Sequence, residues 1–301
     1  MLKVRVNTAL AALGVLPAIV GVQLLSSMLK TLFFGPAWPP EASLFLGISY
    51  VAFSLLILKI WCGYVLRLSF EDCGIGAFRL DSPWRGAAVV LPVSVMCCFF
   101  LFSGNIMHSL WAKQHTAQIL ASGVFFTGIS VAVVEEFTFR GIILRALETR
   151  WHPRTALVLT SLLFGLLHAL EQKLPVVETL QVFTAISFLG FMLGAVVLQS
   201  GNVWNAVWMH MMWNVLIVGG IIHFGDTADV YSFYSYVMST RSLLISGGAF
   251  GVEASVISVA GYMLFGFWAF TLMQKPVNRA GYNFFSVLDA VVFLMYSLRT
   301  K

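Results

Sequence analysis

Two adjacent glutamates, Glu135 and Glu136, interrupt a stretch of sequence that otherwise consists almost entirely of apolar residues. A charged carboxylate at the centre of a membrane helix costs about 2.5 to 3.5 kcal/mol even on lenient insertion scales, so such residues usually serve a function. Two neighbouring carboxylates also repel each other in a low dielectric, which disfavours charging both. Arg140 follows Glu136 by four residues and shares its helix face. The spacing therefore predicts an ion pair between Glu136 and Arg140 and a free carboxylate at Glu135.

Three further polar residues interrupt apolar stretches at helical spacing. His168 follows Phe164 by four residues, and His210 precedes Asn214 by four, so each pair projects from one helix face. At a rise of about 1.5 Å per residue, the two histidines, Asn214 and Glu135 fall within about 10 Å of the same depth. That depth is near the middle of a hydrocarbon core about 30 Å thick. The pattern predicts a polar site inside the membrane.

This set of side chains suits the hydrolysis of an amide bond. A carboxylate beside a neutral imidazole can hold a water molecule and take its proton, which is the general-base step. A second imidazole and a carboxamide N–H can donate hydrogen bonds to the oxyanion that forms when water attacks a carbonyl. We expect water to reach the site from the cytoplasmic side, through a cavity that also admits the backbone of a peptide substrate.

The composition indicates how these residues are positioned. The chain has 301 residues, of which 59 % are hydrophobic and 10 % are charged, whereas about a quarter of the residues of a soluble domain are charged. We therefore predict an all-α, polytopic transmembrane helical bundle that forms a single integral membrane domain over residues 1–301. The net charge of +5 does not indicate nucleic-acid binding, because the lysines and arginines gather at the ends of apolar stretches. The four cysteines lack metal-ligand spacing and are interpreted as unpaired packing thiols.

Apolar stretches of about 20 residues predict eight spans. They are Thr8–Leu29, Leu44–Leu66, Trp84–Ser103, Ile119–Leu147, Thr155–Leu170, Leu180–Leu198, Val203–Phe224 and Val252–Met273. With the N-terminus inside, the inner side would hold twelve lysines and arginines and the outer side four, so both termini are predicted to be cytoplasmic. Ser286–Leu298 is apolar but short, and is expected to lie on the membrane surface.

The polar motifs resemble those of a known family. Glu-Glu-x-x-x-Arg (from Glu135), Phe-x-x-x-His (from Phe164) and His-x-x-x-Asn (from His210) occur in the order seen in the CPBP intramembrane proteases. That family includes type II CAAX prenyl endopeptidases and bacterial proteins of the bacteriocin-processing or immunity type. The resemblance covers about residues 131–215, with a weaker similarity at residues 247–255, and it assigns the catalytic core to residues 119–224.

The resemblance implies a glutamic-type intramembrane endopeptidase. In such an enzyme the catalytic residues would be a base at Glu135, its water-orienting partner at His168, and an oxyanion hole from His210 and Asn214. Support for the site would come from Glu136, Arg140 and Phe164.

No cofactor is predicted. Zinc is the alternative, with Glu135, His168 and His210 as its ligands, but the sequence has no His-Glu-x-x-His or similar pair of metal ligands on one helix. Glu253 is interpreted as a carboxylate in the first turn of the last span, where the helix dipole favours it.

Two other classes of function remain open. A non-catalytic membrane peptide-binding or immunity protein could use the same pocket, and a proton-coupled transporter could use the same Glu and His residues as a relay. The absence of an internal sequence repeat disfavours the transporter. The expected partners are a membrane-associated peptide or protein substrate and the lipid bilayer, with no nucleic acid. The expected location is a prokaryotic plasma membrane.

Overall fold

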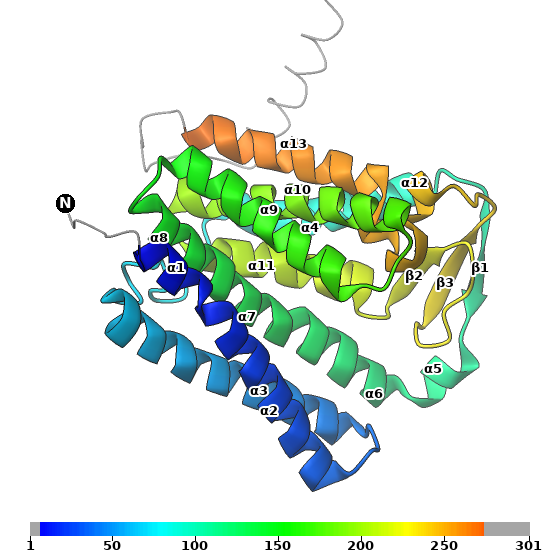
Figure 1. Cartoon of the computed structure of the whole chain (residues 1–301). Coiled ribbons are helices and arrows are strands. Elements are labelled where there is room, and N and C mark those ends of the chain that lie inside the picture. Colours follow the sequence, from blue (N-terminus) through cyan, green and yellow to red (C-terminus); the bar gives the residue numbers. More distant parts are fainter. Residues whose placement is uncertain (1–6, 274–301) are drawn as a thin grey trace, which may run out of the picture.

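Seven helical segments in the computed structural model are long and apolar enough to cross a membrane (Figure 1). The structure describes residues 7–273. The seven segments are Leu10–Phe34, Pro40–Leu66, Ser82–Phe99, Thr116–Glu148, Pro153–Glu171, Val176–Ser200 and Val256–Met273. They confirm the predicted polytopic helical bundle. The predicted surface stretch Ser286–Leu298 and both chain ends lie outside the described residues, and the cytoplasmic placement of the termini stays a prediction.

These segments divide into shorter elements. The first half of the chain contains α1 (Asn7–Leu13), α2 (Val15–Phe34), α3 (Pro40–Ile60), η1 (Trp61–Leu66), α4 (Ser82–Phe99), α5 (Leu110–Gln114), α6 (Thr116–Ile119), η2 (Leu120–Val131), α7 (Ala132–Glu136), η3 (Phe137–Ile143) and α8 (Leu144–Glu148). The second half contains α9 (Pro153–Glu171), α10 (Val176–Ser200), α11 (Val203–Trp213), η4 (Asn214–Val218), α12 (Leu243–Ser246), η5 (Gly248–Phe250), η6 (Val252–Ala254) and α13 (Val256–Met273).

The seventh predicted span, Val203–Phe224, is shorter than expected. Its helix, α11 with η4, ends at Val218. Two glycines follow, and Gly220 adopts a φ of 76°, a left-handed conformation that ends a helix readily. The extension of this span to Phe224 was therefore wrong, because the chain continues into a strand.

A small sheet, which the all-α prediction did not include, lies at one end of the bundle (Figure 1). Its strands are β1 (Gly104–His108), β2 (Ile222–Gly225) and β3 (Tyr234–Met238), in the order β1-β3-β2. β1 pairs antiparallel with β3, and β2 pairs parallel with β3. We call this the sheet end of the bundle.

The opposite end carries the connections at residues 67–81, 149–152 and 201–202, and we call it the basic end (Figure 1). Two of these connections are tied together, because Asn202 donates to the carbonyl of Arg79 at 2.7 Å and the backbone N–H of Val203 donates to Gly74. The basic end holds the arginines that the sequence places inside, including Arg67 and Arg150.

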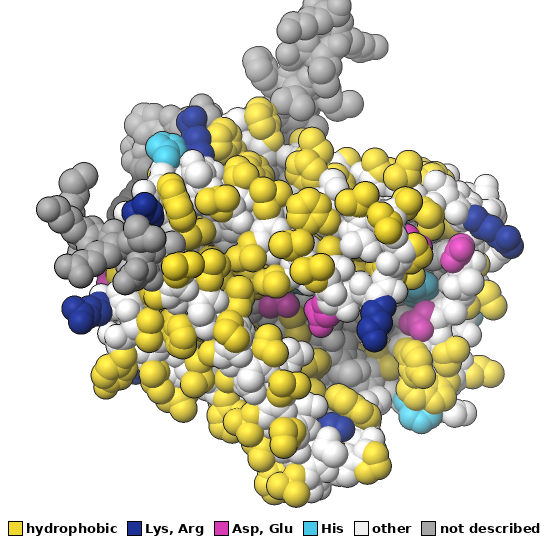
Figure 2. Space-filling view, in the orientation of Figure 1, with side chains coloured by type: hydrophobic (Ala, Val, Ile, Leu, Met, Phe, Trp, Pro, Cys, Tyr) yellow, Lys and Arg dark blue, Asp and Glu magenta, His cyan; other side chains and the backbone are white. Residues whose placement is uncertain are grey.

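Helix α10 lies at the centre of the bundle. In its most hydrophobic stretch 61 % of the residues are buried, against 28 to 39 % for the other spans. Small residues bring α9 close to it: a methyl group on Gly165 would meet the Phe183 carbonyl oxygen at 2.6 Å and the Ser187 hydroxyl. Close contact between small residues is the usual way for helices to associate in lipid. The outer surface is largely hydrophobic (Figure 2).

Candidate active site

Glu136 lies at the centre of a buried polar cluster. Its side chain is fully buried, and its Oε1 accepts hydrogen bonds from Arg140 Nη1 and from His210 Nδ1, each at 2.8 Å. The first contact is the ion pair that the four-residue spacing predicts. The second joins α7 to α11 across 74 residues of sequence, and the sequence did not predict it. Glu136 therefore holds His210 in position as well as pairing with Arg140.

Arg140 connects this cluster to two more helices. Its guanidinium carbon lies 4.2 Å from the centre of the Phe164 ring on α9, and its Nη2 donates to the Gly190 carbonyl on α10 at 3.4 Å. The Phe139 ring meets Phe164 edge-on at 4.8 Å. A cation over an aromatic face is attracted to it, most strongly away from water. Phe164 thus contacts the ion pair directly.

His168 is held by its own helix. Its Nδ1 lies 2.9 Å from the Phe164 carbonyl oxygen, and its ring packs 4.4 Å from the Phe164 ring. A carbonyl oxygen can only accept, so Nδ1 carries the hydrogen. In the neutral ring, Nε2 then keeps a free lone pair. The half-buried His168 is therefore able to accept a hydrogen bond through Nε2.

His210 and Asn214 are both buried, and each is fixed by one contact. Because the Glu136 carboxylate accepts from His210 Nδ1, the other ring nitrogen of His210 is not used in that contact. Asn214 donates from Nδ2 to the Thr127 carbonyl at 3.0 Å, which uses one of its two N–H groups. One nitrogen of His210 and one N–H of Asn214 are thus left for a ligand.

Glu135 differs from its neighbour. It is half-buried, and no hydrogen bond or ion pair of the described residues involves its side chain, whereas Glu136 has two partners. π-helical turns, which often mark functional sites, flank α7 on both sides as η2 and η3. Acidic atoms are visible in a recess of the hydrophobic face of the bundle (Figure 2).

Glu253 is a site residue that the sequence analysis missed. It lies in η6, before α13 begins at Val256, so its interpretation as a first-turn carboxylate of the last span was wrong. Its Oε1 accepts from Trp213 Nε1 at 2.9 Å, and its backbone carbonyl accepts from the Tyr262 hydroxyl at 3.3 Å. Two signals could have pointed to it: the weaker similarity at residues 247–255, and the position of Trp213 next to Asn214.

Charged groups on three other elements act on the carboxyl group of Glu253. Burial raises the pKa of Glu253, and the charge of Glu135 raises it further, while the Trp213 N–H and the charges of His210 and His168 oppose this rise. Contacts join the elements that carry these groups: Glu136 with His210, Trp213 with Glu253, and Arg140 with Phe164. The structure thus gathers α7, α9, α11 and η6 around one polar site.

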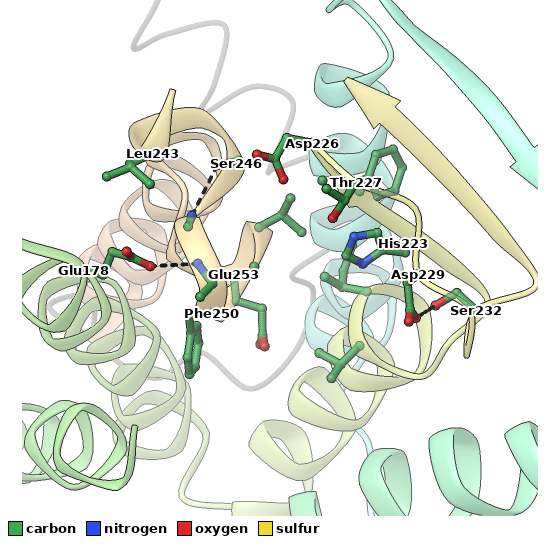
Figure 3. A pocket seen from close by; sticks show the side chains of 18 residues that line it. Glu178, His223, Asp226, Thr227, Asp229, Ser232, Leu243, Ser246, Phe250 and Glu253 are labelled. Atoms are coloured by element: carbon green, nitrogen blue, oxygen red, sulfur yellow. Dashed lines mark hydrogen bonds between the residues drawn. The ribbon is translucent and has the colours of Figure 1, made fainter. Parts of the chain in front are cut away.

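A cavity of about 500 Å³ opens at the sheet end and includes Glu253 in its lining (Figure 3). Its walls come from the start of α10, the connection between β2 and β3, and residues 243–253. His168 lies three residues before the end of α9, and Asn214 lies four residues before the end of η4, so both are near this end. The cavity lies at the end opposite to the expected access, but none of the four predicted catalytic residues lines it, so access from the basic end stays a prediction. Residues 219–255, which build the cavity, fold back over the helix ends.

Among residues 7–273, no three His, Cys, Asp or Glu side chains are grouped so that they could hold a metal ion. The three residues named for zinc, Glu135, His168 and His210, form no such group. The described side chains thus do not fit a three-ligand zinc site, and we derive no step through a metal.

The comparison with known proteins gives one match. Residues 117–216, from α6 to η4, match the family model described as Type II CAAX prenyl endopeptidase Rce1-like. The chain is thus similar to that family over this segment. The Rce1-like segment contains all three motifs, and the seven spans indicate an integral membrane protein. No curated protein and no solved structure matches the chain.

Proposed function

We propose that this protein is a glutamic-type intramembrane endopeptidase that hydrolyses a peptide bond in a membrane-associated peptide or protein. The observation that supports it most is the difference between two adjacent glutamates in an Rce1-like segment. Glu136 accepts hydrogen bonds from both Arg140 and His210 through Oε1, whereas Glu135 has no hydrogen-bond partner among the described residues, and the Nε2 of His168 is left free.

In the proposed reaction, Glu135 takes a proton from a water molecule as general base. The Nε2 lone pair of His168 accepts a hydrogen bond from the other water hydrogen and fixes the direction of attack. Because Phe164 holds Nδ1 of His168, the ring does not need to turn when substrate binds. Preorganisation of this kind lowers the barrier without cost at the moment of reaction.

The oxyanion would be stabilised by His210 and Asn214. The Glu136 carboxylate, 2.8 Å from His210 Nδ1, favours the doubly protonated ring, which can donate from Nε2. The charges of His210 and Arg140 then balance those of the two glutamates, as a low-dielectric site requires. Asn214 would donate through its second N–H.

The proposed access route sets the side of cleavage. The cavity lies at the sheet end, and the lysine and arginine distribution favours a cytoplasmic basic end. We infer that the substrate segment reaches the site from the outer face, as a secreted precursor or leader peptide would, in the proposed prokaryotic plasma membrane. A lipidated cytoplasmic tail fits this arrangement less well.

Cysteine labelling tests this orientation. In a variant without the exposed Cys97 and Cys98, a membrane-impermeant maleimide should label Asp226→Cys in intact cells. Arg150→Cys, at the basic end, should be labelled only after the membrane is opened. The reverse pattern would place the cavity in the cytoplasm.

Cleavage of a membrane-peptide library by the purified protein in detergent, read by mass spectrometry, tests the function. We expect Glu135→Gln to lower the rate by about 10²- to 10⁴-fold, because a carboxamide cannot act as the base. Glu171→Gln, an exposed carboxylate at the end of α9, is the matched control and should cleave normally. Wild-type cleavage by Glu135→Gln would reject the proposal, and binding without cleavage by the wild type would indicate a peptide-binding protein. Loss of activity with a chelator, restored only by added metal, would reject the metal-free version.

A further inference from the structure

Cleavage of a peptide bond needs a proton donor for the leaving nitrogen, which is either the protonated base itself or a second acid. An amine leaves a tetrahedral intermediate readily only when its nitrogen is protonated as the bond breaks. Glu135 acts as the base, His168 orients the water, and His210 with Asn214 faces the oxyanion. Apart from the protonated Glu135, no group is yet assigned to the nitrogen side of the scissile bond.

Glu253 is placed to fill this position. Trp213, which directly precedes Asn214 on α11, fixes Glu253 Oε1 at 2.9 Å, and Tyr262 from α13 fixes its backbone carbonyl. Its Oε2 has no hydrogen-bond partner among the described residues, and the side chain lines the cavity, into which it points (Figure 3). The helix that carries the proposed oxyanion hole thus also orients this carboxyl group.

The surroundings favour the neutral form of Glu253. Burial is the largest influence and raises the pKa of this carboxyl group. The titratable groups that face it are His168 on α9, His210 on α11, Glu135 on α7, Tyr262 on α13, Glu178 on α10, and His223 and Asp229 across the cavity. In many enzymes, two carboxyl groups in different environments act as the acid and the base of one site.

We propose that Glu253 is the general acid of the reaction and protonates the nitrogen of the scissile amide. This inference rests on the proposed function. Water gives one proton to Glu135, and its oxygen bonds to the carbonyl carbon. The C–N bond then breaks, its electron pair stays with nitrogen, and nitrogen takes the proton of Glu253. The proton on Glu135 passes to Glu253 through water in the cavity, and the products are a carboxylic acid and an amine.

The test compares two substrates of one peptide sequence, an ordinary peptide and a 4-nitroanilide. Nitroaniline is a weakly basic leaving group that needs little help from an acid. We expect Glu253→Gln to lower kcat for the peptide by about 10²- to 10⁴-fold and to lower it far less for the anilide. Glu71→Gln, an exposed carboxylate at the basic end and outside the cavity lining, should leave both rates unchanged. Equal losses for the two substrates, or no loss, would overturn the proposal.

A second variant should shift the pH dependence in a direction that a purely structural role of Glu253 would not produce. The Trp213 N–H favours the ionised form of Glu253, so Trp213→Phe should raise the pKa of that carboxyl group. Activity that needs neutral Glu253 is lost as pH rises through this pKa. The alkaline limb of kcat/KM for the peptide should therefore move to higher pH in Trp213→Phe. An unmoved limb, or one at lower pH, would overturn the proposal even if Glu253→Gln does not fold.

The outcomes also separate this inference from the proposed function. If Glu135→Gln is inactive while Glu253→Gln cleaves both substrates normally, the endopeptidase stands and the general acid is another group. If Glu135→Gln cleaves at the wild-type rate, the proposed function itself fails.

Discussion

Removing the positive charge of Arg140 should reveal how strongly the fold depends on the buried cluster. An Arg140→Met variant keeps an unbranched apolar stem and leaves Glu136 without its cation. The two charged atoms are 2.8 Å apart, and the side chains are 1 % and 0 % exposed. At an effective dielectric constant of about 20, their attraction is about 6 kcal/mol. Because desolvation offsets part of it, we expect a net loss of about 3 to 5 kcal/mol in the free energy of unfolding.

The assay is a titration of SDS into mixed micelles, with circular dichroism reporting the unfolding. The matched control is Arg145→Met, one turn further along the same helix. Arg145 pairs with Glu148 at 2.7 Å, but these side chains are 19 % and 18 % exposed, so the loss should be about 1 kcal/mol or less. Arg140→Met should also lower activity, because Glu136 holds His210.

A double variant decides whether the buried charge is the cause. Glu136→Leu combined with Arg140→Met removes both charges and should lose less stability than the two single losses added together. Additive losses would refute the reasoning, and so would an Arg140→Met protein that is as stable as Arg145→Met.

Three further outcomes follow from the packing and the proposed site. Gly165→Ala should lower the free energy of unfolding by about 1 to 3 kcal/mol because its methyl group meets α10. Gly21→Ala, in α2 with open space around it, should gain up to about 1 kcal/mol in the same titration, and a loss at both sites would contradict the packing. Asn214→Ala should lower kcat about 10²- to 10³-fold with little change in KM, and a change in KM alone would argue against an oxyanion contact. A maleimide added in detergent should label the exposed Cys97 and Cys98 and leave the buried Cys62 and Cys73 unlabelled. Mass spectrometry after proteolysis identifies the labelled cysteines.

The amino-acid sequence by itself determined the membrane bundle and the short-range pairs. The backbone of an apolar stretch in lipid can satisfy its hydrogen bonds only as a helix, so seven of the eight predicted spans could be recognised before any packing was known. Helical geometry likewise sets which residues share a face four positions apart. The ion pair of Glu136 with Arg140 follows from it, as does the common face of His210 and Asn214.

Only the tertiary structure decided the contacts between distant segments. The hydrogen bonds from His210 to Glu136 and from Trp213 to Glu253 join residues 74 and 40 positions apart, and no local periodicity encodes which helix faces meet. The sequence analysis did not predict the strand at Ile222–Gly225 for a related reason. A few apolar residues after a helix look alike whether they extend it or pair with another strand, and the partner β3 comes later in the chain. The cavity at the sheet end depends on how residues 219–255 fold back over the helix ends.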